Sequence, residues 1–510
     1  MASMSNIESA IIPRMPRRLL HCAAALLLAS VPGFSQSSAP ATAAPFAISP
    51  ESRDAARQII GDSTLNGKVY AYDRDLADLI GPRLTGSSNY MHAVEWTMQQ
   101  LKESGLPNVH TEMWTIPATW EPQSPAVGRI EKPVAHPLHI YSLGWSPSTP
   151  AQGVEGEVVY VTSFLPEKLE AQGPKLAGKV ALIDSASFGE KPSLGQILSG
   201  LDKLRSFSPL ALVTTGTANG GESQSALGFS GKIAAVPQAQ IGLEDSLLIK
   251  RLLERGSVTV QFTLTNAIRT QVQIPTVIGE IPGSALPDEV VIVGAHLDSW
   301  HPGTGAQDNG TGVASVLEVA RAIKALPRAP RRTIRFMLFG GEEQGLLGST
   351  AYVRQHLADL AKIDAVLITD TGSEPAKGWY VMGRDDEKDA VGALKPLLSG
   401  LGADGVSTDV SFVFQTDHAA FDVLGVPSLV LWNDMDKYNP LHHKASDTFD
   451  SVVEKDLVQD AVVTAVTAYA IADGKGPFAP HISPAEMQSM LKKADHLDDY
   501  NFLKSAGVLP

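Results

Sequence analysis

Histidine and aspartate residues follow an apolar run in the second half of the 510-residue chain. His296 and Asp298 come directly after VVIVGA (290–295), and Asp308 lies in the glycine-rich loop behind them. Their spacing lets His296 and Asp298 point to one side, so that Asp298 can orient the imidazole. Glycines allow the loop to turn tightly and approach a bound ion. Imidazole beside carboxylates is typical of a divalent metal site.

Further candidates follow other apolar runs that predict strands: Glu342 and Glu343 after TIRFMLFG (333–340), Asp370 at the end of AVLITD (365–370), and His443 behind PSLVLW (427–432). Taken singly, a carboxylate at a strand end is more often a helix cap or a solvated group. Several strand ends that all carry metal-ligating residue types are hard to obtain by chance. Two imidazoles with three carboxylates favour zinc, with cobalt or manganese as substitutes.

This set of residues indicates hydrolytic chemistry. One carboxylate can bridge two ions, which leaves each ion a histidine, a second carboxylate and a shared water. Two ions held this way polarise a carbonyl and lower the pKa of the water. The carboxylate not used as a ligand is then available as the general base.

The elements that would position these residues alternate between strands and helices from about residue 272 onward. VVIVGA is followed by the helical pattern TGVASVLEVARAIKAL (311–326), the strand TIRFMLFG and a second helical pattern. This order predicts an α/β fold with a mostly parallel mixed sheet flanked by helices. In such sheets ligands bind beyond the carboxyl ends of the strands, which is where the candidate residues lie.

The chain is too long for one core, and its composition divides it. Residues 126–267 hold short β-rich runs separated by glycine and proline turns, without clustered His, Asp and Glu. We predict an inserted β-rich domain there, with the main domain divided into residues 37–125 and 268–510.

Residues 1–36 are typical of an export signal. Arg14, Arg17 and Arg18 precede the apolar run 19–31, which is too short to span a bilayer comfortably, and small residues follow. The alternative is a short membrane anchor. We expect signal removal, a periplasmic or extracellular location and no stable membrane association. The only cysteine, Cys22, lies in this segment, and the net charge of −14 argues against nucleic-acid partners.

Six motifs together resemble the co-catalytic zinc exopeptidases of the bacterial leucyl aminopeptidase type, with the greatest likeness to the plasma glutamate carboxypeptidase (carboxypeptidase Q) branch. They are HLDSW (296–300), GAQDNGTG (305–312), GEEQGLLGS (341–349), TDTG (369–372), TDHAAFDVLGVP (416–427) and HHKASDT (442–448). IGPRLTGS (80–87) also resembles this branch. The likeness covers most of the mature chain and implies a zinc-exopeptidase-like fold, with a protease-associated-type domain at the position of the insert.

The resemblance also implies a role for each candidate. Asp308 bridges two Zn²⁺ ions per chain, His296 and Asp370 bind one ion, and Glu343 and His443 bind the other. Glu342 is the general base, and Asp298 supports His296. The Asp308–Asn309 peptide bond is implied to be cis.

The substrate pocket is less well defined by sequence. Trp300 and His301 fall beside the glycine-rich loop that carries Asp308, and Asp417 and His418 belong to a family motif. These four are candidates for the pocket, with a purely structural role as the alternative. We predict a secreted metallo-exopeptidase that hydrolyses dipeptides and short peptides, with a preference for those bearing a free carboxylate. An aminopeptidase, a non-catalytic binding protein and a one-zinc acyltransferase resembling glutaminyl cyclase are the alternatives. The sequence does not decide the oligomeric state, and a homodimer is one of the states considered.

Overall fold

The structure is a computed structural model that describes residues 45–184, 194–216 and 229–510. The predicted export signal, residues 1–36, lies outside the described residues. None of the helices in the described part of the chain combines the length and apolarity that a membrane span requires.

The main sheet has eight strands, and its four central strands are parallel. In spatial order the strands are β1 (Asn108–Pro122), β10 (Asn266–Ile281), β12 (Arg332–Phe339), β11 (Leu286–His296), β13 (Ile363–Ile368), β16 (Ser428–Asn433), β14 (Ala376–Tyr380) and β15 (Gly405–Ser407). The pairs β1 with β10, β10 with β12 and β14 with β16 are antiparallel. The prediction of a mostly parallel mixed sheet is therefore confirmed.

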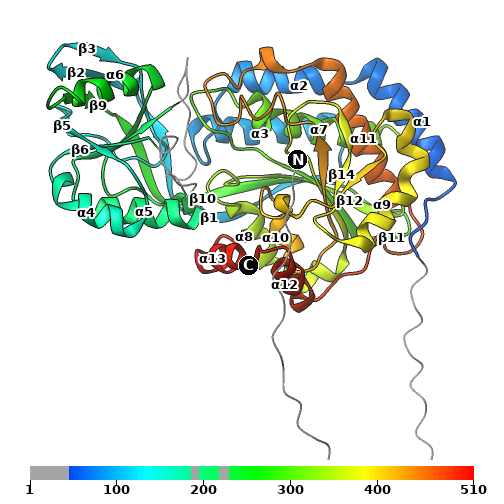
Figure 1. The fold of residues 1–510 in the computed structure, drawn as a ribbon. Coiled ribbons are helices and arrows are strands. Elements are labelled where there is room, and N and C mark those ends of the chain that lie inside the picture. The colour runs from blue at the N-terminus through cyan, green and yellow to red at the C-terminus, as the bar shows by residue number, and fades with distance from the viewer. Residues whose placement is uncertain (1–44, 185–193, 217–228) are drawn as a thin grey trace, which may run out of the picture. The chain divides into compact units, whose positions relative to one another are not determined.

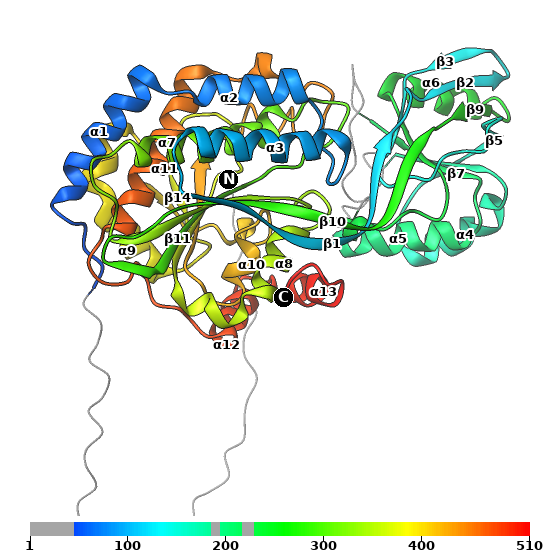
Figure 2. The same ribbon diagram turned by 180° about the vertical axis from the view of Figure 1, so that it is seen from behind.

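Helices cover both faces of this sheet (Figures 1 and 2). One face carries α1 (Glu51–Asn66), α2 (Val69–Asp75), α3 (Ser88–Glu103), α7 (Thr311–Lys324), α9 (Asp385–Leu398) and α11 (Glu454–Ala472). The other carries α8 (Leu347–Gln355), α10 (Ala419–Asp422), α12 (Pro484–Lys493) and α13 (Leu497–Ser505). Strand β13 is apolar on both faces, so both faces of the sheet must be buried by helices. Its residues Ala365 and Leu367 enter one core and Val366 and Ile368 the other, because successive strand side chains point to opposite faces.

A second eight-stranded sheet is formed by residues between Val127 and Thr263, within the predicted insert. Its spatial order is β3 (His136–Leu138), β2 (Val127–Lys132), β9 (Thr259–Thr263), β5 (Val154–Val161), β6 (Val180–Ile183), β7 (Ala211–Thr215), β8 (Gln238–Ile241) and β4 (Ile140–Ser142). Three helices accompany it: α4 (Pro166–Leu176), α5 (Leu194–Ser206) and α6 (Leu243–Leu253). The short β-rich runs predicted the strands of this region but gave no sign of these helices.

Candidate active site

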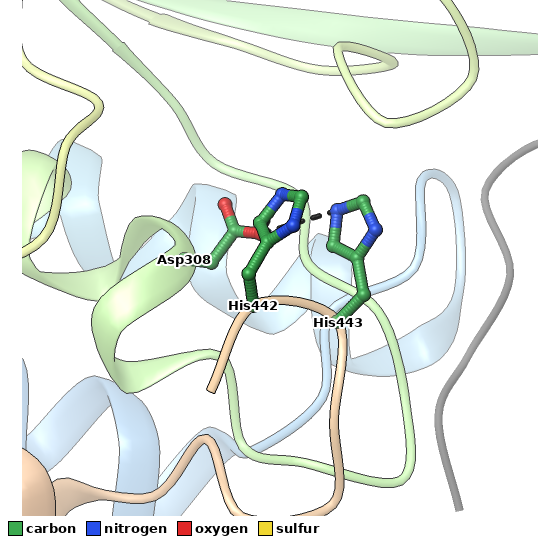
Figure 3. Close-up of side chains that lie close together, drawn as sticks. All are labelled: Asp308, His442 and His443. Atoms are coloured by element: carbon green, nitrogen blue, oxygen red, sulfur yellow. Dashed lines mark ion pairs between the residues drawn. The ribbon is translucent and has the colours of Figure 1, made fainter. Parts of the chain in front are cut away.

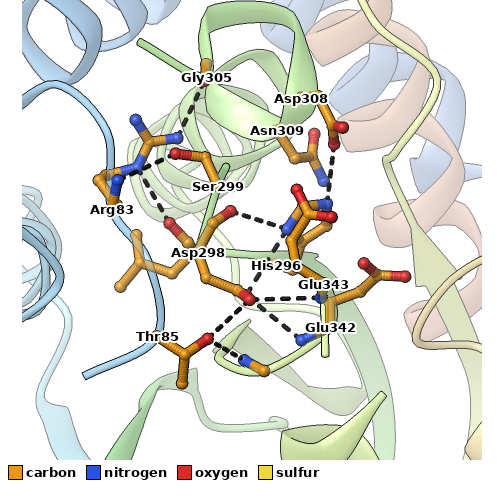
Figure 4. A network of polar contacts seen from close by, with 12 residues as sticks. Arg83, Thr85, His296, Asp298, Ser299, Gly305, Asp308, Asn309, Glu342 and Glu343 are labelled. Atoms are coloured by element: carbon orange, nitrogen blue, oxygen red, sulfur yellow. Dashed lines mark hydrogen bonds and ion pairs between the residues drawn. The ribbon is translucent and has the colours of Figure 1, made fainter. Parts of the chain in front are cut away.

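The register of the central strands brings the candidate residues to one edge of the main sheet. His296, the last residue of β11, lies opposite Phe339 at the end of β12, so the Glu342–Glu343 turn begins beside it. On the other side of β11, Gly294 pairs with Ile368, and Asp370 follows this strand end. The glycine-rich loop returns Asp308 over the same edge, as Figure 4 shows. The Asp308–Asn309 peptide bond is cis, as expected.

Asp308 lies between two groups of side chains. Its Oδ1 is 3.2 Å from Nε2 of His296, and that nitrogen is also 3.2 Å from Oδ1 of Asp370. Its Oδ2 is 3.2 Å from Nε2 of His443, which lies 2.8 Å from Oε2 of Glu343. The two carboxylate oxygens of Asp308 therefore face two different imidazole–carboxylate pairs. All five predicted ligands are brought together.

These spacings fit metal coordination. Ligand atoms about 2.0 to 2.2 Å from a tetrahedral ion lie roughly 3.3 to 3.6 Å apart, close to most of the separations here. Oε1 of Glu343 is buried and has no hydrogen-bond partner within the described part of the chain, so it keeps lone pairs for a cation. The donor set of two imidazoles and three carboxylates suits a borderline divalent metal.

The ligands also depend on one another for charge balance. Burial by itself would lower the pKa of His443, but Glu343 and Asp308 raise it to about 10. Burial would raise the pKa of Asp308, yet hydrogen bonds from His296 and His443 hold it well below its usual range. A buried site with this excess of carboxylates is stabilised by cations, either protons on the imidazoles or metal ions.

Glu342 is not part of either imidazole–carboxylate pair. Its side chain is half-buried and lines the cavity beside the cluster. Burial raises its pKa well above the usual range; His296 opposes this, and the nearby carboxylates of Asp370 and Glu343 add to it. A carboxylate with a raised pKa at the edge of a metal cluster is suited to accept a proton during a reaction.

Asp298 contacts His296 through its backbone carbonyl as well as through its carboxylate, and the carbonyl is nearer. The backbone carbonyl of Asp298, rather than its carboxylate, is hydrogen-bonded to Nδ1 of His296 at 2.9 Å. The carboxylate lies 3.7 Å from that nitrogen. It accepts hydrogen bonds from the Thr85 hydroxyl at 2.8 Å and from the backbone N–H groups of Glu342 and Glu343 at 3.4 and 3.3 Å. Asp298 therefore orients the imidazole through its backbone and holds the glutamate turn through its side chain.

A cavity of about 580 Å³ opens beside the cluster. Asp308, Glu342, Glu343, Asp370 and His443 line one side of it. The other lining residues are mainly apolar and aromatic. They are Gly345 and Leu346 and residues from the segments 411–415, 435–442 and 496–508. Its volume is in the range of pockets that enclose a small ligand.

Comparison with known proteins identifies the family. Residues 276–468 match the family described as Peptidase family M28. Carboxypeptidase Q of Bos taurus is 32% identical over 433 residues, which cover 82% of this chain and 89% of that protein. The chain belongs to peptidase family M28. It is a peptidase, and its clustered ligand set is that of a metallopeptidase.

Solved structures agree with this assignment. The crystal structure of a peptidase M28 precursor from Shewanella amazonensis covers 84% of this M28 peptidase and 99% of its own chain, with a TM-score of 0.71 and 29% identity. A zinc aminopeptidase from Bacillus subtilis has the same fold, with a TM-score of 0.61, 22% identity, and coverage of 78% of this chain and 93% of its own.

Two residues, Arg83 and Asp447, position the glycine-rich loop that carries Asp308. Neither was identified as functional from the sequence of this M28 peptidase. The buried guanidinium of Arg83 donates hydrogen bonds to the carbonyls of Leu297 at 3.0 Å, Thr304 at 2.8 Å and Gly305 at 2.9 Å, so it joins the end of β11 to the loop before Asp308 (Figure 4). The carboxylate of Asp447 accepts from the backbone N–H groups of Gln307 and Asp308 at 2.7 and 3.1 Å. Burial raises the pKa of Asp447 to about 7. Their only sequence signal was their place in IGPRLTGS and HHKASDT.

A third imidazole, His442, lies beside the predicted ligands (Figure 3). Its ring stacks on that of His443 with centroids 3.7 Å apart, and its Nε2 is 3.5 Å from Oδ2 of Asp308. Burial, with the neighbouring His443, lowers the pKa of His442 to about 4. It is more exposed than His443, with 44% against 17% of the side chain accessible, and it lines the cavity. A neutral imidazole at this position can contact a substrate held at the cluster.

The four residues suggested for the substrate pocket are buried: Trp300, His301, Asp417 and His418. None of them is among the residues that line the large cavity. Trp300 lies against His443, with ring centroids 6.1 Å apart, and His301 lies against Trp120 at 5.0 Å. Their role in substrate binding stays a prediction, and the contact of Trp300 with His443 suits support of the site.

Proposed function

We propose that this M28 peptidase is an exported di-zinc exopeptidase that hydrolyses dipeptides and short peptides. The observation that carries the proposal is the position of Asp308, whose Oδ1 and Oδ2 each face a separate imidazole–carboxylate pair at 3.2 Å. His296 and Asp370 would hold one zinc ion, and Glu343 and His443 the other. Asp308 would be the ligand that both ions share.

The protein residues divide the catalytic work. Zinc bound at this cluster would supply Lewis acidity, polarising a peptide carbonyl and lowering the pKa of water. Glu342 accepts the proton of the attacking water and delivers it to the leaving amine, for which its raised pKa is suitable. Asp298 holds Glu342 in place through the backbone of the turn.

The size and position of the cavity support a short substrate. About 580 Å³ beside the cluster admits a peptide terminus and a neighbouring side chain rather than a folded segment. Export is supported by the three arginines followed by the apolar run 19–31. The resemblance to carboxypeptidase Q of Bos taurus favours a carboxypeptidase among the exopeptidases.

One observation favours a second candidate, an aminopeptidase. Among the residues that the structure describes around the cavity there is no lysine or arginine that could pair with a substrate carboxylate. Asp499 lines the same cavity, apart from the metal-site carboxylates, and is suited to pair with an ammonium group. The side chains around the cavity therefore offer a free amine one carboxylate outside the metal site, and offer a free carboxylate no lysine or arginine.

Blocked substrates test the function and separate the two candidates. We expect a dipeptide with two free ends to be hydrolysed and a doubly blocked peptide, N-acetylated and C-amidated, to resist, with a rate difference of about 100-fold or more when a site loses a paired charged group. Product formation by liquid chromatography measures both.

Singly blocked dipeptides decide the direction. A carboxypeptidase tolerates N-acetylation and loses activity on C-amidation, and an aminopeptidase shows the reverse. Efficient hydrolysis of the doubly blocked peptide would contradict an exopeptidase of either kind.

A further inference from the structure

The C-terminal end of the chain forms one wall of the cavity. After α12 the chain continues into α13, which lies beside α8 and α10 in both views (Figures 1 and 2). The segment contributes five lining residues: His496, Asp499, Phe502, Leu503 and Val508. These residues belong to none of the motifs that carry the metal cluster and its general base.

This wall is fixed to the helix that follows the Glu342–Glu343 turn. The hydroxyl of Thr350, on α8, donates a hydrogen bond to the carbonyl of Val508. The guanidinium of Arg354, also on α8, donates to the carbonyl of Leu509 at 3.0 Å. Leu509 is fully buried and belongs to the same apolar cluster as Leu503. The position of the wall relative to the general base is therefore set by direct contacts.

The part of the wall formed by Phe502, Leu503 and Val508 is apolar, and it shares the cavity with other aromatic side chains. Phe502 is half-buried and shares the cavity with Phe412 and Phe414, which are also half-buried. The ring of Phe414 meets that of His496 edge to face, with centroids 6.3 Å apart, so the two segments contact each other. The accessible faces of these rings can bury an apolar group, at about 25 cal/mol per Å² removed from water.

We infer that α13 determines side-chain specificity: Phe502 and Leu503, together with Phe412 and Phe414, bind a large apolar or aromatic side chain of the residue beside the scissile bond. The inference rests on the proposed peptidase function. An acidic side chain is disfavoured, because the cavity lining carries carboxylates and, in the part of the chain that the structure describes, no lysine or arginine.

The test compares Phe502→Ala with Asn501→Ala, a control at an exposed position of the same helix that does not line the cavity. The kcat/KM is measured for Ala-Ala, Phe-Ala and Ala-Phe dipeptides, so that either residue of the substrate is sampled. For Phe502→Ala we expect at least one of the two ratios, Phe-Ala to Ala-Ala or Ala-Phe to Ala-Ala, to fall about 10-fold or more. Activity on Ala-Ala should stay within about 3-fold of the wild type, and Asn501→Ala should change neither ratio.

Unchanged ratios in Phe502→Ala would overturn the inference, as would an equal loss on all three dipeptides, which indicates a general role in folding. Phe502→Leu keeps an apolar side chain at this position and serves as the control for misfolding of Phe502→Ala. It should lower the same ratio by a smaller factor, with an unchanged melting temperature. A wild-type enzyme that hydrolyses none of these dipeptides would instead contradict the proposed function, and this inference with it.

Discussion

Replacing the general base by its amide, Glu342→Gln, is expected to lower kcat by about 10² to 10⁴ while zinc remains bound. The amide has nearly the same size and keeps the hydrogen bond from its backbone N–H to Asp298, but it cannot accept a proton. Glu342 lies outside both imidazole–carboxylate pairs, so the ligand set stays intact. Steady-state kinetics and elemental analysis of the same preparation measure the two quantities together.

Glu95→Gln, the same exchange at an exposed position of α3, is the matched control and should leave both quantities unchanged. A Glu342→Gln enzyme with near wild-type turnover would contradict the role of general base. Loss of zinc in this variant would show that Glu342 is itself a ligand.

The variant Glu343→Ala is expected to lose metal, from about two zinc ions per chain to about one, and with it at least as much activity as Glu342→Gln loses. Removal of the Glu343 carboxylate leaves His443 and Asp308 as the proposed ligands on the Oδ2 side, with His442 stacked on His443 rather than assigned as a ligand. Two protein ligands do not complete the three that catalytic zinc sites normally use. Elemental analysis after dialysis against zinc-free buffer measures the loss.

The two adjacent glutamates serve as controls for each other. If Glu343→Ala retained its zinc and Glu342→Gln lost it, the assignment of ligand and base would be reversed. Recovery of Glu343→Ala activity at high zinc concentration would agree with weakened binding at an otherwise intact site.

The metal cluster could be predicted from sequence because parallel strands end at a common edge. His296, Glu343 and Asp370 each follow an apolar run, and the register of β11 with β12 and β13 makes them neighbours. Residue types that bind metals stand out in a sequence when they occur at strand ends. The central sheet and the two helical layers followed from the same alternation of apolar runs.

The supporting contacts could not be predicted in the same way. Arg83 donates hydrogen bonds to backbone carbonyls more than two hundred residues away in the sequence. Its place in IGPRLTGS marks the residue but does not indicate these partners. Asp298 was expected to orient His296 with its carboxylate. The carboxylate lies 3.7 Å from Nδ1 of His296, and the backbone carbonyl of Asp298 is the hydrogen-bond partner of that nitrogen at 2.9 Å. The choice between a side chain and its own backbone depends on loop geometry, which the residue types do not specify.

The cavity wall formed by α13 could not be predicted from the sequence either. Phe502 and Leu503 belong to a short helix, and the contacts of the C-terminal segment with α8 accompany their position in the cavity that Glu342 also lines. Long-range packing of this kind depends on tertiary contacts rather than on local spacing.

The most direct test of the account is the number and position of metal ions in the wild-type protein. Anomalous diffraction at the zinc edge, with elemental analysis of the same sample, should give two zinc ions per chain, one between His296 and Asp370 and one between Glu343 and His443, with Asp308 between them. A single ion after reconstitution with excess zinc, or two ions that do not share Asp308, would contradict the two-metal site.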